Sequence, residues 1–151
     1  MAFGTVKVDS ITSSTQTLTV DNLLESGDLG STAAGLDNAQ TFTKGQRGEI
    51  TTLTSGSTVT PDFADSNNFT LTLGTNVSLA NPTNLVAGQS GSIFLVQDGT
   101  GNRTITFTGT YWDFAGGTAP TLSTAASTVD RLDYIVRSTT SIHAVVTLAY
   151  S

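Results

Sequence analysis

Short stretches of alternating apolar and polar residues recur along this chain, and each is closed by Gly, Asn, Asp, Ser or Pro. A period of two is the pattern of a strand that buries one face. Threonine, which occurs 29 times, supports the same conclusion because β-branched side chains favour strands over helices. This rhythm predicts an all-β fold, either a sandwich or a barrel. Beyond residue 45 we expect strands within the segments 48–54, 57–63, 68–74, 76–81, 91–98, 103–109, 110–114, 130–138 and 141–150.

The first part of the chain has a different composition. Two short alternating stretches begin it, and residues 21–45 are rich in Gly, Ser and Asp with few apolar positions. So few apolar residues are not expected to bury a core of their own. We therefore predict that residues 1–45 form an extended N-terminal arm and linker, and that residues 46–151 form a β-sandwich domain. The arm is expected to gain its burial from another protein chain.

Three patterns give more detailed expectations for this domain. The nearly apolar run Ile93–Val96 is typical of a strand covered on both faces, which places it centrally or at a subunit contact. Turn residues at 98–102 and 138–141 predict two hairpins. Alternation in the last two strands assigns one face of each to the core: Leu132, Tyr134, Val136, Ile142, Ala144, Val146 and Leu148.

Charge and cysteine content argue against several classes of protein. The 151 residues include 6 Lys and Arg against 12 Asp and Glu, whereas nucleic-acid binding depends on basic side chains. The chain has no cysteine, which removes disulfides and thiolate metal sites. No apolar stretch approaches the roughly 18 residues that span a bilayer, and the N-terminus lacks a signal-peptide pattern. We expect no nucleic-acid partner, no membrane and synthesis in a cytoplasm without signal-driven export.

The sequence has few of the residue types and spacings that catalysis usually requires. A triad needs a base beside a nucleophile, and His143, the only histidine, lies within the last predicted strand. Glycoside cleavage needs two facing carboxylates, and the spacing of the acidic residues singles out no pair. The stretch "DGTGN" lacks the acidic spacing of a calcium loop. We therefore predict a protein that is not an enzyme, with no catalytic residue, metal or cofactor. The carboxylates considered are Asp98, Asp113, Asp130 and Asp133.

One aromatic cluster could bind a ligand. Arg103, Tyr111 and Trp112 combine rings that stack on sugars with a guanidinium that can hold a carboxylate or phosphate. Strand alternation divides this set, because Trp112 and Phe114 share one side while Tyr111 points to the other. We favour the interpretation in which Trp112 and Phe114 enter the core and Tyr111 stays partly exposed.

A longer pattern carries a resemblance to a known family. The run from Gly88 contains "GQSGSIFLVQDG", an Arg-led threonine strand, "WDFAGGTAPTLST", "DRLDY" and "IHAV", and it resembles a C-terminal β-domain found on many virion proteins of tailed phages. The preceding "NAQTFTKGQRGEITTL" is similar to the start of the same domain, so the resemblance covers roughly residues 38–151. Such domains recur on tail fibres, head fibres and capsid decoration proteins.

The resemblance implies a sandwich of about eight strands, often trimeric, carried by an N-terminal segment that docks on the particle. The predicted fold class is therefore all-β, an antiparallel, jelly-roll-like β-sandwich preceded by an extended N-terminal arm. The arm meets the predicted sandwich directly, without the long shaft of a receptor-binding fibre. Strand addition to a neighbouring chain would suit its alternating residues.

Our leading hypothesis is a virion protein that decorates and cements the capsid. Its expected partner is the major capsid protein or another virion component. The alternative is a short head or tail fibre that binds host-surface glycans through Arg103, Tyr111 and Trp112. Both hypotheses expect a homo-oligomer, with a trimer implied by the resemblance. The residues predicted to dock on the capsid are Val6, Val8, Ile11, Leu18, Val20, Leu23 and Leu24.

Overall fold

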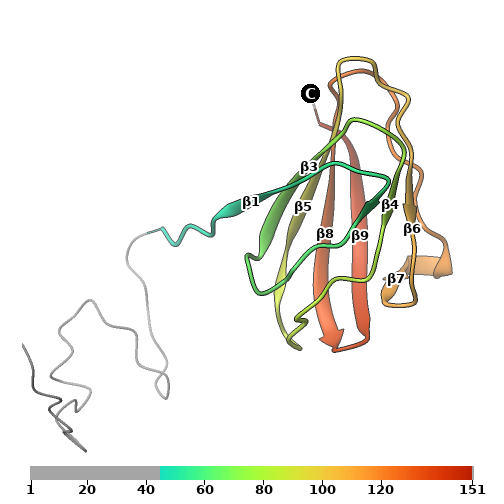
Figure 1. Ribbon diagram of the computed structural model, residues 1–151. Helices are drawn as coiled ribbons and strands as arrows, with labels where there is room; N and C mark the ends of the chain where they lie inside the picture. Colours follow the sequence, from blue (N-terminus) through green and yellow to red (C-terminus); the bar gives the residue numbers. More distant parts are fainter. Residues whose placement is uncertain (1–44, 151) are drawn as a thin grey trace, which may run out of the picture. The chain divides into compact units, whose positions relative to one another are not determined.

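The computed structural model describes residues 45–150 (Figure 1). The chain divides into two units, Met1–Gly45 and Gln46–Ser151, and all of the described residues except Gly45 belong to the second. Each of the nine segments predicted from the alternation overlaps one strand, so the all-β prediction is confirmed for this part of the chain. The strands are β1 (Ile50–Leu53), β2 (Thr58–Val59), β3 (Asn68–Leu73), β4 (Val77–Leu79), β5 (Ser90–Gln97), β6 (Ile105–Phe107), β7 (Trp112–Phe114), β8 (Val129–Ser138) and β9 (Ser141–Tyr150). A short 3-10 turn, η1 (Ala115–Gly117), follows β7.

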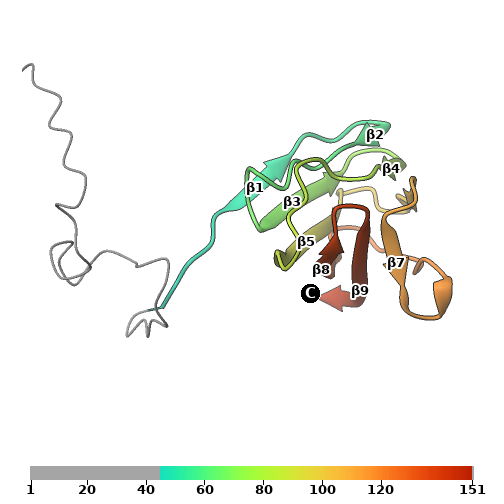
Figure 2. The same ribbon diagram turned by 90° about the horizontal axis from the view of Figure 1, so that it is seen from below.

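The strands form two sheets. The larger has six strands in the order β1-β3-β5-β8-β9-β7, and the smaller has three in the order β2-β4-β6. The first six strands alternate between the sheets, so each connection crosses from one layer to the other (Figure 2). Strands that return to the same sheet therefore run in the same direction, and β1, β3 and β5 pair in parallel, as do β2, β4 and β6. This part of the chain winds like three turns of a parallel solenoid.

The predicted antiparallel arrangement is wrong for most of this fold. Only β5 with β8 and β8 with β9 pair in the antiparallel direction. The loop at 98–102, predicted to be a hairpin, instead joins β5 of the larger sheet to β6 of the smaller one. A hairpin connects neighbours in one sheet, whereas a crossover between sheets lets the next strand return parallel. The hairpin predicted at 138–141 is confirmed, because it joins β8 to β9.

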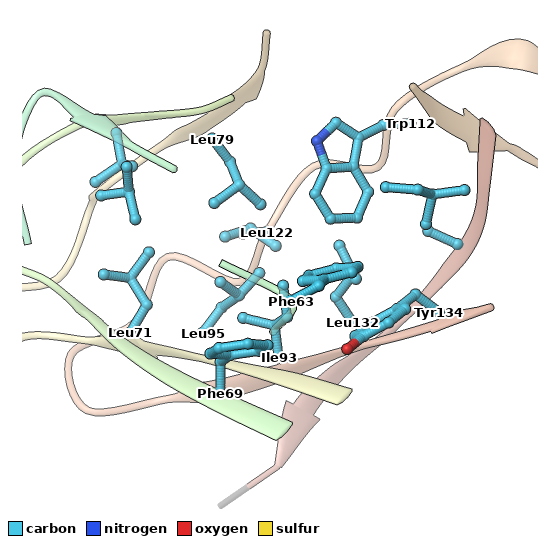
Figure 3. Packing of buried hydrophobic residues seen from close by; sticks show 14 of the residues in the cluster. Phe63, Phe69, Leu71, Leu79, Ile93, Leu95, Trp112, Leu122, Leu132 and Tyr134 are labelled. Carbon is cyan, nitrogen blue, oxygen red and sulfur yellow. The ribbon is translucent and has the colours of Figure 1, made fainter. Parts of the chain in front are cut away.

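The apolar core lies between the two sheets (Figure 3). The prediction of a central strand at Ile93–Val96 is confirmed, because β5 has neighbours on both sides and buries Ile93 and Leu95. Phe63 stacks on Tyr134 with ring centroids 4.5 Å apart. The fully buried side chains that the figure labels are Phe69, Leu71, Leu79, Ile93, Leu95 and Leu132.

The face predicted for the last two strands is correct except at its end. Leu132, Ile142 and Ala144 are buried, but Leu148 remains 48% exposed. The register changes there, since Arg131 pairs with Thr147 and Val129 pairs with Tyr150. An extra residue in β9 therefore disturbs the alternation at Leu148. The buried Asp130 carboxylate accepts hydrogen bonds from the Ser123 and Ala149 N–H groups at 2.7 and 2.8 Å, which holds the bulge in place.

Candidate functional site: a groove along an edge strand

Arg103 lies two residues before β6 and is held by Gln97, the last residue of β5, and by Asp98, which follows it. Its Nε and Nη2 atoms donate to one carboxylate oxygen of Asp98 at 2.9 and 2.8 Å. The buried Gln97 side chain accepts a hydrogen bond from the Arg103 N–H and donates one to the Arg103 carbonyl. The Arg103 guanidinium and the N–H groups of Gly101 and Thr100 hold the pKa of Asp98 below its usual value. Arg103 thus has a fixed position with part of its guanidinium exposed.

Trp112 lies in β7 and is only 8% exposed, which confirms the prediction that it enters the core. Its indole Nε1 donates to the Ala80 carbonyl at 3.1 Å. The Phe107 ring meets it edge-on, with centroids 5.8 Å apart, and also meets Phe114 edge-on. Tyr111 is half-buried and packs against the core from the neighbouring position. An open aromatic platform formed by Tyr111 and Trp112 is therefore absent.

Two hollows lie along β6, a strand in the yellow-to-orange part of the ribbon in Figure 1. One has a volume of about 360 Å³ and begins at Arg103, and the other has about 200 Å³ and ends at Trp112. Phe107 and Ala119 line both, so the two hollows are adjacent, and we call them together the edge groove. The lining residues are Arg103, Thr104, Ile105, Thr106, Phe107, Gly109, Trp112, Asp113, Phe114, Gly117, Ala119, Pro120, Thr121, Leu122 and Thr124.

The strand that forms one wall of the groove has an unpaired side. β6 is the edge strand of the smaller sheet and pairs with β4 alone. The Val77 N–H donates to the Thr104 carbonyl, and the Thr108 N–H donates to the Leu79 carbonyl. Backbone groups of successive residues in a strand point to opposite sides, so those of Phe107 point away from β4. The groove therefore offers main-chain donors and acceptors as well as side chains.

A comparison with family models gives one match to this chain. Residues 59–141, from β2 to the start of β9, match the family described as "Putative phage tail fibre C-terminal domain". The chain belongs to this family. A search of curated proteins and a search of solved structures each gave no match. This tail fibre domain is thus part of a tailed-phage virion structural protein, as the resemblance implied.

The edge groove of the tail fibre domain combines groups that suit a carbohydrate. Threonine hydroxyls along it, from Thr104 and Thr106 on one wall and Thr121 on the other, can exchange hydrogen bonds with sugar hydroxyls. Phe107 and Pro120 present apolar surface to the C–H groups of a sugar ring. Of the three predicted glycan contacts, the groove brings together Arg103 and Trp112, whereas Tyr111 is not among its lining residues.

Of the residues considered for catalysis, His143, Asp113 and Asp133 line one hollow of the tail fibre domain, whereas Asp98 and Asp130 lie elsewhere. His143 is exposed on β9, opposite Asp113 in the register, and the Asp113 carboxylate accepts a hydrogen bond from the Ser141 hydroxyl at 2.7 Å. Asp130 is buried and holds backbone N–H groups, and Asp133 pairs with Arg131 at 2.9 Å. Within residues 45–150 no cluster of His, Asp and Glu is arranged to hold a metal ion. No helix in the same range is long and apolar enough to cross a membrane.

The predicted docking residues cannot be compared with the structure, and part of the groove was not predicted. The seven capsid-docking residues, Val6 to Leu24, lie outside the described residues, as does most of the predicted arm. Sequence reasoning missed the far wall of the groove at Pro120 and Thr121, because these residues meet β6 only through the fold. The alternation of "RTITFTG" does place Thr104 and Thr106 on one face, and this is the available sequence signal for the near wall.

Proposed function

We propose that this chain is a short fibre protein of the phage virion, and that its edge groove binds a host-surface glycan. The observation that carries this proposal is the pair of adjacent hollows between Arg103 and Trp112, with an unpaired strand edge along one wall. The match to a tail fibre domain supports the fibre over the capsid-decoration hypothesis. The proposed role is binding without catalysis.

The order of polar and apolar groups along the groove suggests how a bound glycan would lie. At one end Asp98 neutralises part of the Arg103 charge, while the exposed part of the guanidinium remains able to donate to a hydroxyl or carboxylate. Towards the middle, Phe107 and the threonines alternate apolar and hydroxyl surface. Asp113, at the Trp112 end, can accept from a sugar hydroxyl. A linear stretch of a polysaccharide fits this sequence of groups better than a compact charged ligand does.

The experiment blocks the groove at its centre. Ala119 is exposed and lines both hollows, so Ala119→Trp is expected to fill the groove without disturbing the core. Ala87→Trp, in the exposed loop before β5, is the matched control. Binding to an array of bacterial surface polysaccharides should be lost in the first variant and kept in the second. A wild-type chain that binds no polysaccharide, or an Ala119→Trp variant that binds equally well, would contradict the proposal.

Attachment to the particle is proposed to use the arm, residues 1–45, with its apolar positions docking on another virion component. We also propose a homo-oligomer, a trimer by the resemblance noted above. Deletion of residues 2–24 should leave a folded domain that no longer joins particles. Density for the protein in an averaged image of the intact virion distinguishes the two hypotheses, since a regular coat on the head shell would favour capsid decoration and density at the tail would favour adhesion.

A further inference from the structure

The larger sheet has one face turned away from the core, and on β8 and β9 this face exposes two large apolar side chains. Ile135 on β8 is 50% exposed and Val145 on β9 is 59% exposed. Their chain neighbours Tyr134 and Ala144 are buried, so alternation places Ile135 and Val145 on the opposite side of the sheet. We call this side the outer face.

The outer face has two hollows into which side chains can pack. One has a volume of about 530 Å³ and is lined by Ile135, His143 and Val145 among others, with Asp133 at its wall. The other has a volume of about 230 Å³ and lies among Phe94, Val129, Arg131 and Tyr150. The Arg131 guanidinium lies over the Tyr150 ring, 5.3 Å from its centroid. An exposed apolar surface with such relief is typical of a protein contact.

The charges on this face are balanced, although the chain as a whole has a net charge of −6. Arg131 and Arg137 occupy outward positions of β8, and Asp133 and Asp113 provide two negative charges. Arg131 and Asp133 form an ion pair at 2.9 Å, and Ser92 donates to Asp133 at 2.6 Å. Most other acidic residues of residues 45–150 lie elsewhere, so this face is free of the repulsion that an acidic chain exerts on its own copies.

We infer that the outer face of the larger sheet packs against a second copy of this chain. Around a rotation axis in front of this face, the outer faces of the copies meet, and their apolar side chains can pack in the hollows. With two Arg and two Asp side chains, the face has no net charge that would favour a strongly acidic or a strongly basic partner over a second copy. The inference rests on the oligomer proposed above and adds the face that forms it. This face is centred on β8 and β9 and shares Asp113 with the edge groove.

The test uses the full chain and compares two charged substitutions. Val145→Asp places a carboxylate in the centre of the outer face, while Val86→Asp changes a residue of similar exposure, 66%, in a loop before β5. Sedimentation velocity over a dilution series should show an oligomer for the wild type and the Val86 variant. The Val145 variant should associate at least about tenfold more weakly, because an unpaired charge is costly in an apolar contact. Circular dichroism checks that each variant is folded.

A second measurement tests the same face without adding charge. The chain has no cysteine, so Val145→Cys and Val86→Cys each carry a single thiol. A flexible bis-maleimide should link two copies through residue 145 much more efficiently than through residue 86. A monomeric wild type would overturn both the oligomer and this inference. If the Val145→Asp variant associates as strongly as the wild type, and both cysteines are linked equally well, the choice of face is wrong while the oligomer stands. Neither result tests glycan binding by the edge groove, which is measured separately.

Discussion

The indole Nε1 of Trp112 donates a hydrogen bond to the carbonyl of Ala80 at 3.1 Å, and this contact joins the two sheets. Trp112 belongs to β7 of the larger sheet, whereas Ala80 follows β4 of the smaller one. The ring also contacts Phe107 of β6, which lines the edge groove. Trp112 therefore supports the groove from behind while showing little of its own surface to a ligand.

Replacing Trp112 with Phe should destabilise the domain by about 1–3 kcal/mol, because the Ala80 carbonyl loses its buried donor. Urea unfolding followed by circular dichroism measures this, since the variant lacks the tryptophan signal. The wild-type fluorescence should be poorly quenched by iodide. Full stability in the variant, or an easily quenched wild-type indole, would contradict the buried position.

A substitution at Gly91 should be far more damaging than one at Gly99. An added Cβ at Gly91 would lie 1.6 Å from the Asn67 carbonyl oxygen, whereas nothing lies within 4 Å of a Cβ at Gly99. Because backbone atoms cannot move aside cheaply, Gly91→Ala should lower the free energy of unfolding by about 3 kcal/mol or more. Gly99→Ala is the matched control, and a similar melting temperature for both variants would show that β3 and β5 do not approach as closely as described.

Alkaline pH should weaken the fold through Tyr134. Burial raises the pKa of Tyr134 to about 12, and its hydroxyl donates to the Asn67 carbonyl at 2.8 Å. An unfolded tyrosine has a pKa of 10.0, so the unfolded state loses its proton first. Stability should therefore be unaffected by this group below pH 10 and should fall as the pH rises towards 12. Denaturant unfolding across this range should be less pH-dependent for Tyr134→Phe than for the wild type, and equal slopes would refute the assignment.

Low pH should destabilise the domain by protonating Asp98, whose carboxylate binds Arg103. The pKa of Asp98 is lowered chiefly by the hydrogen bonds from Arg103, so its stabilising effect is complete above the ordinary value of 3.8 and is lost as the pH falls through the lowered value. Asp98→Asn keeps an acceptor for the loop N–H groups but cannot titrate. Its stability should depend less on pH below 3.8 than that of the wild type. Parallel acid dependence in the two proteins would exclude Asp98 as a source.

Local patterns in the sequence were sufficient to locate the strands and most of the buried residues. The alternation around Trp112 predicted its burial correctly, because side chains of neighbouring strand residues point to opposite faces whatever the strand pairs with. Leu148 is the exception, and its exposure follows from a bulge in β9 opposite Asp130 that alternation does not encode.

The edge groove was only half predictable. Arg103, Thr104 and Thr106 follow one another in the sequence, and alternation places the two threonines on one face. The opposite wall, with Pro120 and Thr121, comes from the segment between η1 and β8. No short-range pattern indicates that this segment lies against β6.

The sequence by itself determined which segments become strands and which of their side chains face the core, because both depend on residues one or two positions apart. Only the tertiary structure decided the direction and partner of each strand. The loop after Asp98 illustrates the reason: Gly101 fits there because its backbone lies against Thr124 and Ala126, and an added Cβ would meet the Thr124 carbonyl oxygen at 2.6 Å. Such a long-range contact makes the loop a crossover between sheets, whereas its residues alone are equally suited to a hairpin.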